Sequence, residues 1–533
     1  MIKPHPFRWG FFKRGNMLLD TFSELERNRY EKMLEMRAQG LEPYPTRSRK
    51  DTEAAAAITR FEEAEKAANS TPIQVTLGGR IRAIRNMGKL SFAHIEDKSG
   101  KVQLFFRVDE LGQEKLDFFA NHFDLGDFVE ASGTMFRTQR GEVTLQVSDF
   151  WMLAKALLPL PADKDEVVEG KLVRHSQLSD PETRFRIRYV DLAVNPEVRK
   201  IFKTRAAVIK SIRKFLDEKG FLEVETPVLQ PIYGGAAAKP FLTFHNQLKQ
   251  QLYLRISFEL YLKRLIVGGF DRVYEIGRDF RNEGVSFKHY PEFTQMELYM
   301  AYGDYQTMMD LTEQMVSQVA QEVLGTQIIQ FDGHEINLTT PWKRVQIREG
   351  LMDLAGIDIA AYPTAEALGE VLKEKKINFK PGTPRGKMIS LLMEEYLEPA
   401  CIQPTFLYDY PRDISPLAKN KPEDPSTVER FEAFISGVEL GNAFTELNDP
   451  LEQERRFSEM GREYGEGEEE RHPMDEDYLR AMAYGMPPMG GFGMGVDRLV
   501  MFLTNNHNIR EVILFPHLRV TLDENKEEPT QQV

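Results

Sequence analysis

The sequence predicts an α+β protein in which a small β-barrel precedes a larger domain whose helices flank a mainly antiparallel sheet. Five short runs of alternating apolar residues lie between residues 75 and 153, separated by turn residues such as Gly100 and Gly141. Farther along, residues 271–302 predict two long strands joined by a charged loop. With 533 residues, the chain is long enough for at least two domains.

Composition limits the possible partners and compartments. The chain has 82 acidic and 69 basic residues, a net charge of −13. Overall charge therefore does not predict a nucleic-acid partner, and a local basic patch would have to provide the contacts. The single cysteine, Cys401, excludes an intrachain disulfide and a cysteine-based zinc cluster, which fits a reducing cytoplasm. No apolar run is long enough to span a bilayer, so we expect a cytoplasmic protein without a membrane partner.

The N-terminal part divides into an extension and two helices. Residues 1–16 carry four Lys or Arg and no acid, and we interpret them as an N-terminal extension, with Met17 a possible alternative start. Residues 17–70 predict two charged helices, at about 20–40 and 51–68.

The five short strands, within residues 71–156, predict an OB-fold, a barrel that commonly binds single-stranded nucleic acid. Its first three strands and their turns contain seven basic and two acidic residues, although the whole chain is acidic. Recognition of single-stranded RNA needs a stacking ring, a polar group for base edges and a cation for phosphate, which Phe92, Gln103 and Arg85 supply. The alternative is that Phe92 is a core ring and Gln103 a solvated edge residue.

The remaining chain predicts one large domain. Residues 157–195 are interpreted as a linker and hinge, and residues 196–520 as the domain, with a mainly helical insertion at about 310–400 and a C-terminal tail at 521–533. Asn195 followed by Pro196 predicts the start of a long helix, because asparagine caps helices and proline suits their first position.

The predicted hairpin at 271–302 contains donors for an anion beside an acidic and aromatic face. In its second strand, a ring, an amide, a carboxylate and a phenol share one face because side chains alternate along a strand. Arg281 ends the first strand beside the loop. We expect a site for a ligand that is both anionic and cationic, built from Arg281, Glu283, His289, Phe293, Glu297 and Tyr299.

A later β-rich run, RFEAFISGVELGNAFTELND, predicts the other half of the site. Alternation places on one face the side chains of Asn442, Phe444 and Glu446. Glu439 has the opposite parity, and a bulge at Gly441 would turn it inward. Glu432 and Glu439 suit Mg²⁺, which is usually bound by few carboxylates together with phosphate oxygens. The alternative is a solvated strand edge.

Three segments carry a resemblance to a known family. FRNEG at 280–284, followed by EFTQMELY, resembles motif 2 of the class II aminoacyl-tRNA synthetases. GGFGMGVDRLVMFL at 490–503 resembles motif 3, and the long helix with the strand and proline after it resembles motif 1. YLRISFELYLKRLIVGGF resembles the lysyl branch of that class. The match runs from about residue 17 to the end of the chain.

The resemblance implies a function and its ligands. It implies that ATP and L-lysine react, with several Mg²⁺ ions, to give lysyl-adenylate, and that the lysine is transferred to the 3′ end of tRNA(Lys) by a homodimer formed through the motif 1 region. Arg281 and Arg498 would be catalytic, holding the α- and γ-phosphates. The implied ATP-binding residues are Arg281, Glu283, His289, Phe293 and Arg498. Glu432 and Glu439 would bind magnesium.

The same resemblance implies the residues that select the amino acid and the tRNA. The implied lysine-binding residues are Gly235, Glu259, Glu297, Tyr299, Asn442, Phe444 and Glu446. Phe444 would cover the apolar stem of lysine, and Glu446 with Tyr299 would hold its ε-ammonium. Arg85, Phe92 and Gln103 would bind the anticodon. The chain departs from the commonest family residues at Lys239, Phe258 and Tyr290.

Two alternatives remain. An aspartyl- or asparaginyl-tRNA synthetase would share the same core but would need a cation at the end of the amino-acid pocket. A non-catalytic tRNA-binding paralogue would lose Arg281, Arg498 or the paired acids, all of which are present.

Overall fold

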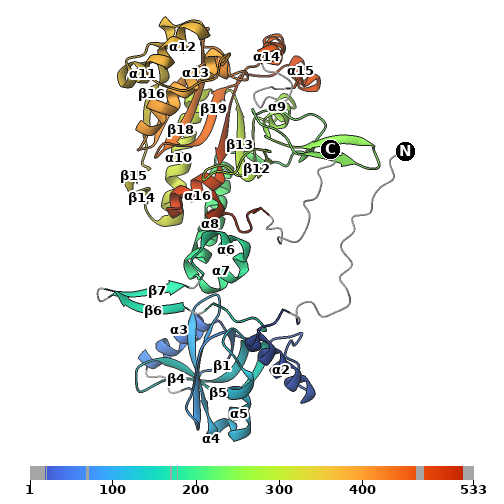
Figure 1. Ribbon diagram of the computed structural model, residues 1–533, viewed down its shortest axis with the longest axis vertical. Helices are drawn as coiled ribbons and strands as arrows, with labels where there is room; N and C mark the ends of the chain where they lie inside the picture. The colour runs from blue at the N-terminus through green and yellow to red at the C-terminus, as the bar shows by residue number, and fades with distance from the viewer. Residues whose placement is uncertain are drawn as a thin grey trace. The chain divides into compact units, whose positions relative to one another are not determined.

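The computed structural model describes residues 19, 21–67, 71–161, 163–168, 171–176, 178–463 and 473–519. It divides into two compact units, Met1–Ser179 and Asp180–Val533 (Figure 1). The first is a β-barrel with helices and the second a large mixed sheet with helices, which confirms the predicted α+β fold. The predicted extension at 1–16 and tail at 521–533 lie outside the described residues.

The first unit is a closed five-stranded barrel in the order β1-β2-β3-β5-β4, the predicted OB-fold. Inward-facing residues alternate with outward-facing ones, so that Ala93 and Ile95 of one strand meet Val102 and Leu104 of the next in the core. Its elements are α2 (Glu24–Ala38), α3 (Ala54–Lys66), β1 (Gln74–Asn86), β2 (Leu90–Glu96), β3 (Lys101–Arg107), α4 (Val108–Leu111), α5 (Gln113–His122), β4 (Phe128–Arg137) and β5 (Val143–Ala154).

The segment interpreted as a linker contains regular structure. Strands β6 (Asp163–Val168) and β7 (Lys171–Ser176) pair as an antiparallel hairpin, and helices α6 (Pro181–Arg186) and α7 (Arg188–Val194) follow. The linker interpretation rested on charged composition, which does not prevent backbone hydrogen bonds between two strands.

The second unit is built on an eight-stranded sheet in the order β16-β17-β18-β19-β20-β13-β12-β8. Its neighbouring strands are antiparallel except for the pairs β16–β17 and β12–β8. The strands are β8 (Leu222–Glu223), β12 (Arg272–Phe280), β13 (Glu292–Ala301), β16 (Lys343–Gln346), β17 (Thr405–Pro411), β18 (Thr427–Ile435), β19 (Val438–Thr445) and β20 (Met489–Gly495). Smaller sheets contain β9 (Leu229–Gln230), β10 (Leu242–His245), β11 (Gln250–Leu254), β14 (Ile328–Phe331) and β15 (His334–Asn337).

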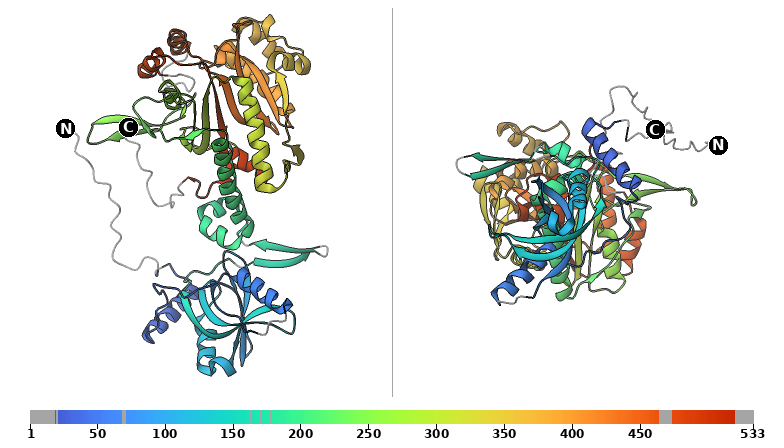
Figure 2. Two further views of the ribbon diagram at one scale, coloured as in Figure 1. Left: turned by 180° about the vertical axis from the view of Figure 1, so that it is seen from behind. Right: turned by 90° about the horizontal axis from the view of Figure 1, so that it is seen from below.

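Helices cover the large sheet from two sides, and each side has its own core. Two long helices and one short helix pack on one face, where α8 and α10 lie side by side (Figure 2, left). These are α8 (Pro196–Glu218), α10 (Tyr305–Leu324) and α16 (Val496–Thr504). Helices that contribute to the second core are α9 (Glu259–Val267), α11 (Ile347–Ala355), α12 (Ala365–Glu374), α13 (Arg385–Leu392), α14 (Pro450–Glu463) and α15 (Glu476–Ala483). Short 3₁₀ or π turns are η1 (Ile359–Ala361), η2 (Met393–Leu397), η3 (Glu398–Ala400), η4 (Arg412–Ile414) and η5 (Ile509–Val512).

Two expectations about the second unit differ from the structure. The segment at 310–400 is not wholly an insertion, because α10 buries Met315 and Val319 in the same core as α8, and β16 forms an edge of the main sheet. Asn195 stands at the start of α8, but its side chain does not cap the helix. It donates a hydrogen bond to Asp191 instead, at 2.7 Å.

Across the described ranges, the helices are too short or too polar to cross a membrane.

Candidate functional site

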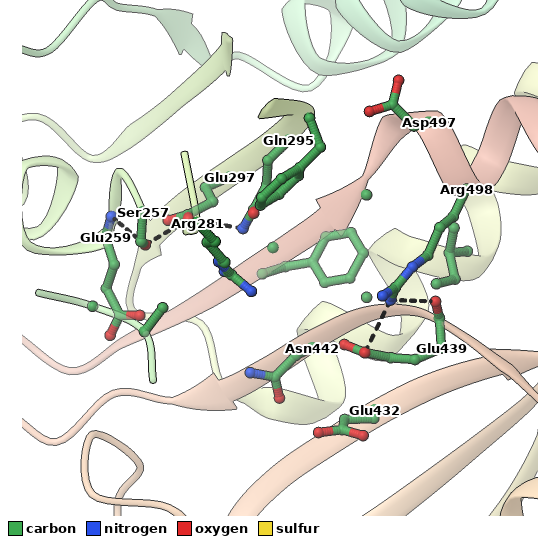
Figure 3. A pocket seen from close by; sticks show the side chains of 18 of the residues that line it. Ser257, Glu259, Arg281, Gln295, Glu297, Glu432, Glu439, Asn442, Asp497 and Arg498 are labelled. Carbon is green, nitrogen blue, oxygen red and sulfur yellow. Dashed lines mark hydrogen bonds and ion pairs between the residues drawn. The ribbon is translucent and has the colours of Figure 1, made fainter. Parts of the chain in front are cut away.

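One cavity of about 340 Å³ lies over the middle of the large sheet. It is lined by every site residue that the sequence predicts in the second unit, contributed by α9, β13, β18, β19, α16 and the loops beside β9, β12 and β19 (Figure 3). These residues are Gly235, Glu259, Arg281, Glu283, His289, Phe293, Glu297, Tyr299, Glu432, Glu439, Asn442, Phe444, Glu446 and Arg498.

The cavity exists because strand β20 presents glycines to it. Gly491 pairs with Tyr299 on one side and Phe444 on the other, and Gly493 pairs with Glu297 and Asn442. A Cβ at Gly491 would lie only 2.4 Å from Cε1 of Tyr299 and would also collide with Glu446. These glycines therefore keep the floor of the cavity free of side chains.

Two arginines enter the cavity from different elements. Arg281, just after β12, points into the middle of the cavity (Figure 3), with its guanidinium carbon 5.1 Å from the centre of the Phe293 ring. Arg498 lies in the first turn of α16 and donates to the carbonyl and carboxylate of Glu439, at 2.8 and 3.0 Å. Its neighbour Asp497 pairs with Arg205 rather than with Arg498. The two cations therefore face one space, as an anionic ligand requires.

Glu439 reaches the cavity through a β-bulge, whereas Glu432 lies in the regularly paired part of β18. The pairing of β18 with β19 shifts by one residue, so Ala433 faces Gly441 and Phe434 faces Glu439, leaving Leu440 as the extra residue. A bulge was predicted here, and it turns Glu439 inward. Burial raises the pKa of Glu432, and Glu439 adds to the rise. Burial would also raise the pKa of Glu439, but the Arg498 guanidinium outweighs it and lowers that pKa.

At the other end of the cavity, hydrogen bonds hold Glu297 in place. Its carboxylate accepts from Ser257 Oγ at 2.7 Å, from Gln295 Nε2 at 2.9 Å and from the Tyr299 hydroxyl at 3.1 Å. Burial, assisted by the charge of Glu259, nevertheless raises the pKa of Glu297 to about 7. The group can therefore change its charge near neutral pH.

Gly235 brings the backbone close to this end of the cavity. Its φ is +87°, and a Cβ would lie 2.9 Å from both Ser257 Oγ and Glu259 Cβ. Both the conformation and the lack of space favour glycine.

A buried lysine joins two of the acids. The Lys263 ammonium lies 2.5 Å from Glu259 Oε1 and also pairs with Glu446 Oε2. Burial raises the pKa of Glu446 well above its ordinary value, and Lys263 opposes the rise. The other oxygen of Glu446, Oε1, is buried and has no hydrogen-bond partner among the described residues. Such an acceptor is costly to leave unpaired and suits a cationic ligand.

His289 lies at the edge of the cavity, near the loop. Its Nδ1 is 2.9 Å from Ser286 Oγ. Burial lowers its pKa, and the positive charge of Arg498 lowers it further, so the ring is neutral at pH 7.

The first unit brings Arg85, Phe92 and Gln103 to its outer surface. Arg85 pairs across strands with Phe92, whose ring stacks on Phe105 at 4.7 Å. On the same strands as Phe92 and Phe105, His94 pairs with Gln103. Gln103 Nε2 donates to Glu142 Oε2 at 2.9 Å. The ring and the amide are therefore half-buried on one face with a polar network beside them, and neither is a core residue.

Comparison with known proteins identifies both units. Residues 180–519 match the model of class II tRNA synthetases (D, K and N), and residues 75–153 match the OB-fold nucleic acid binding domain. A lysine–tRNA ligase of Roseiflexus castenholzii is 51% identical over 500 residues, which cover 93% of this chain and 99% of the relative. One of Chloroflexus aurantiacus is 49% identical over 502 residues, covering 94% and 99%.

The chain belongs to the lysine–tRNA ligase family.

Within this ligase family member, three residues near the predicted site were missed by sequence reasoning. Ser257 orients Glu297, to which its hydroxyl donates at 2.7 Å. Arg430 orients Glu432 and Asn442, to which it donates at 2.6 and 2.9 Å. Lys263 stands four residues after Glu259 on α9, a spacing that puts both on one helix face and was a usable signal. Lys239, a departure from the commonest family residue, does not line the cavity, whereas Tyr290 does.

Proposed function

We propose that this ligase activates L-lysine with ATP to lysyl-adenylate and transfers the lysine to the 3′ end of tRNA(Lys). The observation that carries the proposal is that one cavity is lined both by two arginines, Arg281 and Arg498, and by Glu446, whose buried oxygen Oε1 has no hydrogen-bond partner among the described residues. Lysine needs both the arginines and the free oxygen. Its carboxylate must be held beside the α-phosphate, and its ε-ammonium needs a hydrogen-bond acceptor. An aspartate or asparagine ligase would instead need a cation at the position of Glu446.

The proposed first step is an in-line displacement at the α-phosphorus. A carboxylate oxygen of lysine forms a bond to the α-phosphorus, and the bond from that phosphorus to the bridging oxygen breaks, so pyrophosphate leaves. Arg281 would hold the α-phosphate beside the carboxylate, and Arg498 would hold the γ-phosphate. Their contribution is orientation together with stabilisation of the charge on the phosphoryl oxygens. In the second step, the terminal ribose hydroxyl of the tRNA attacks the lysyl carbonyl and AMP leaves.

Magnesium would be held by Glu432 and Glu439. Their carboxylates line the same cavity as the two arginines, and the charge of Glu439 adds to the rise in the pKa of Glu432 that burial causes. This donor set suits Mg²⁺, which takes one or two carboxylates with phosphate oxygens. When bound, the ion would neutralise phosphate charge. Loss of exchange on chelation and its return with Mg²⁺ would test this.

Amino-acid-dependent ATP–pyrophosphate exchange tests the function. We expect exchange with lysine and none above background with aspartate or asparagine. Exchange with aspartate but not lysine would reject the assignment, and no exchange with any of the three would favour the non-catalytic alternative.

We also propose that the protein is a cytoplasmic homodimer. The segment after α8 exposes apolar side chains that a second copy would cover, since large exposed apolar patches mark interaction sites. They are Leu222, Val228, Leu229, Ile232, Leu242 and Phe244. Sedimentation at the mass of a single chain would contradict the dimer.

Lysine binding is expected to weaken as the pH falls below about 7. The pKa of Glu297 is raised to about 7. Below that pH the Glu297 carboxyl is protonated and uncharged, so it stabilises the positively charged lysine less than a carboxylate does. Above that pH the carboxyl is already charged, and lysine binding does not require the loss of a proton. The KM for lysine should therefore rise by up to about tenfold per pH unit below neutrality, with little change in the KM for ATP. Exchange kinetics from pH 6 to 8 measure this, and Glu297→Gln should weaken the dependence.

Replacing Phe92 with alanine is expected to separate the two steps. A ring that stacks on a base contributes about 1–3 kcal/mol, so kcat/KM for tRNA charging should fall by about 10- to 100-fold. Lysine-dependent exchange should stay within about twofold, because it needs no tRNA. The matched control is Phe118→Ala, a half-buried ring on α5 of the same unit. An equal fall in lysine-dependent exchange and in tRNA charging in Phe92→Ala would contradict the role of Phe92 in tRNA binding alone.

A further inference from the structure

The second unit contains a lysine that its proposed chemistry does not use. The side chain of Lys263 is fully buried, and it does not line the cavity although both of its acidic partners do. Its ammonium therefore contacts Glu259 and Glu446 from behind the cavity wall. The same ammonium lies 5.3 Å from the ring centre of Phe444 and 5.8 Å from that of Tyr299. It contacts the very groups that the sequence assigns to the substrate.

The charges around Lys263 come from every element packed against it. Glu259 is on its own helix, Glu297 and Tyr299 are on β13, and Glu446 follows β19. Tyr478 on α15 also interacts with Lys263, and Arg430 on β18 interacts with Glu259. The positive charge of Lys263 thus partly offsets the negative charges of Glu259, Glu297 and Glu446. An apolar residue of similar volume would pack as well without the cost of burying a charge, so packing alone does not account for a lysine here.

We propose that Lys263 is a positioning residue for amino-acid selection: by holding one oxygen each of Glu259 and Glu446, it keeps the free oxygen of Glu446 directed at the ε-ammonium of the substrate. The inference rests on the proposed function. Without Lys263, the carboxylates of Glu259, Glu297 and Glu446 would lose the buried cation that pairs with two of them. Repulsion would then favour a proton on Glu446, and a neutral acid distinguishes lysine poorly from its uncharged isostere norleucine.

Steady-state exchange with a Lys263→Met variant tests the proposal. Removing one partner of a buried charge pair should raise the KM for lysine by about 100-fold at pH 7, whereas kcat and the KM for ATP should change by less than about threefold. Raising the pH should recover part of the loss, because a higher pH favours the charged carboxylate of Glu446. Competition by norleucine, relative to lysine, should increase. The wild-type enzyme measured with lysine in the same assay tests the proposed function separately.

The chain offers a matched control. Lys155 in the first unit is also fully buried between two carboxylates, at 2.6 Å from Asp124 and 2.8 Å from Asp127. Lys155→Met removes the same kind of buried group, so a general cost of losing it would appear in both variants. We expect Lys155→Met to leave the KM for lysine within about twofold of wild type. A comparable rise in both variants would overturn the proposal.

Two further variants keep the test decisive if Lys263→Met folds poorly. Lys263→Arg retains the cation, so its KM for lysine should stay within about tenfold of wild type. A loss in Lys263→Arg as large as that in the methionine variant would show that packing matters rather than charge, and would overturn the proposal. In a Glu446→Gln background, Lys263→Met should add little further effect, because the two residues act through one contact. Fully additive effects would also overturn it.

Discussion

Replacing Arg281 with alanine is expected to lower kcat/KM for lysine-dependent exchange by about 10⁴-fold, the scale at which arginines act in phosphoryl transfer. Arg281 is the cation that points into the middle of the cavity (Figure 3), between the Arg498 end and the Glu297 end. It is therefore placed to contact the α-phosphate and the lysine carboxylate together. The measurement is the exchange rate over a range of lysine concentrations that extends below the KM, which gives kcat/KM.

Arg278 provides the control for this variant. It precedes Arg281 on the same hairpin and does not line the cavity, and its side chain donates to the carbonyl of Glu292 at 3.3 Å. Arg278→Ala should keep exchange within about threefold of wild type, since exposed contacts of this kind contribute little. If Arg281→Ala retained a tenth of the activity, the phosphate-binding role would be wrong.

Replacing Glu446 with glutamine is expected to lower kcat/KM for lysine by about 10³-fold and to leave the KM for ATP nearly unchanged, because a buried acceptor of a charged group is lost. The change preserves volume but removes the negative charge. The amide would turn its oxygen to Lys263, and its NH₂ group would then face the substrate ammonium. Exchange with varied lysine and varied ATP separates the two KM values.

Glu454, an exposed residue on α14, is the matched control for Glu446. Glu454→Gln removes the same charge from the surface and should leave both KM values unchanged. A rise in the KM for ATP equal to that for lysine in Glu446→Gln would place Glu446 outside the amino-acid end of the cavity.

Much of the site could be predicted from the sequence, because side chains alternate between the two faces of a regular strand. Alternation correctly put Glu297 and Tyr299 on one face of their strand, and Asn442 and Phe444 on one face of theirs. All four side chains line the cavity. Alternation also indicated that the Glu439 side chain would face away from the site unless a bulge turned it inward. The roles of these residues stay predictions.

Other features depend on contacts between distant segments and could not be read from local patterns. The Lys263–Glu446 pair joins residues 183 positions apart, and only the packing of α9 against the sheet brings them together. The role of Gly491 depends on its neighbours in β13 and β19, which lie far from it in sequence. The segment at 310–400 was interpreted as an insertion from the family resemblance, and amphipathic patterns in its helices do not reveal which core they join.

The glycine strand β20 has a consequence for the folded state. A sheet is normally stabilised by a layer of side chains on each face, but along Gly491, Gly493 and Gly495 one layer is missing. Substrates that fill the cavity would complete that layer, so part of the protein's interior is supplied by its ligands. Bound lysine and ATP should therefore act as structural components as well as reactants, and the resistance of the second unit to heat should report how much of each is bound.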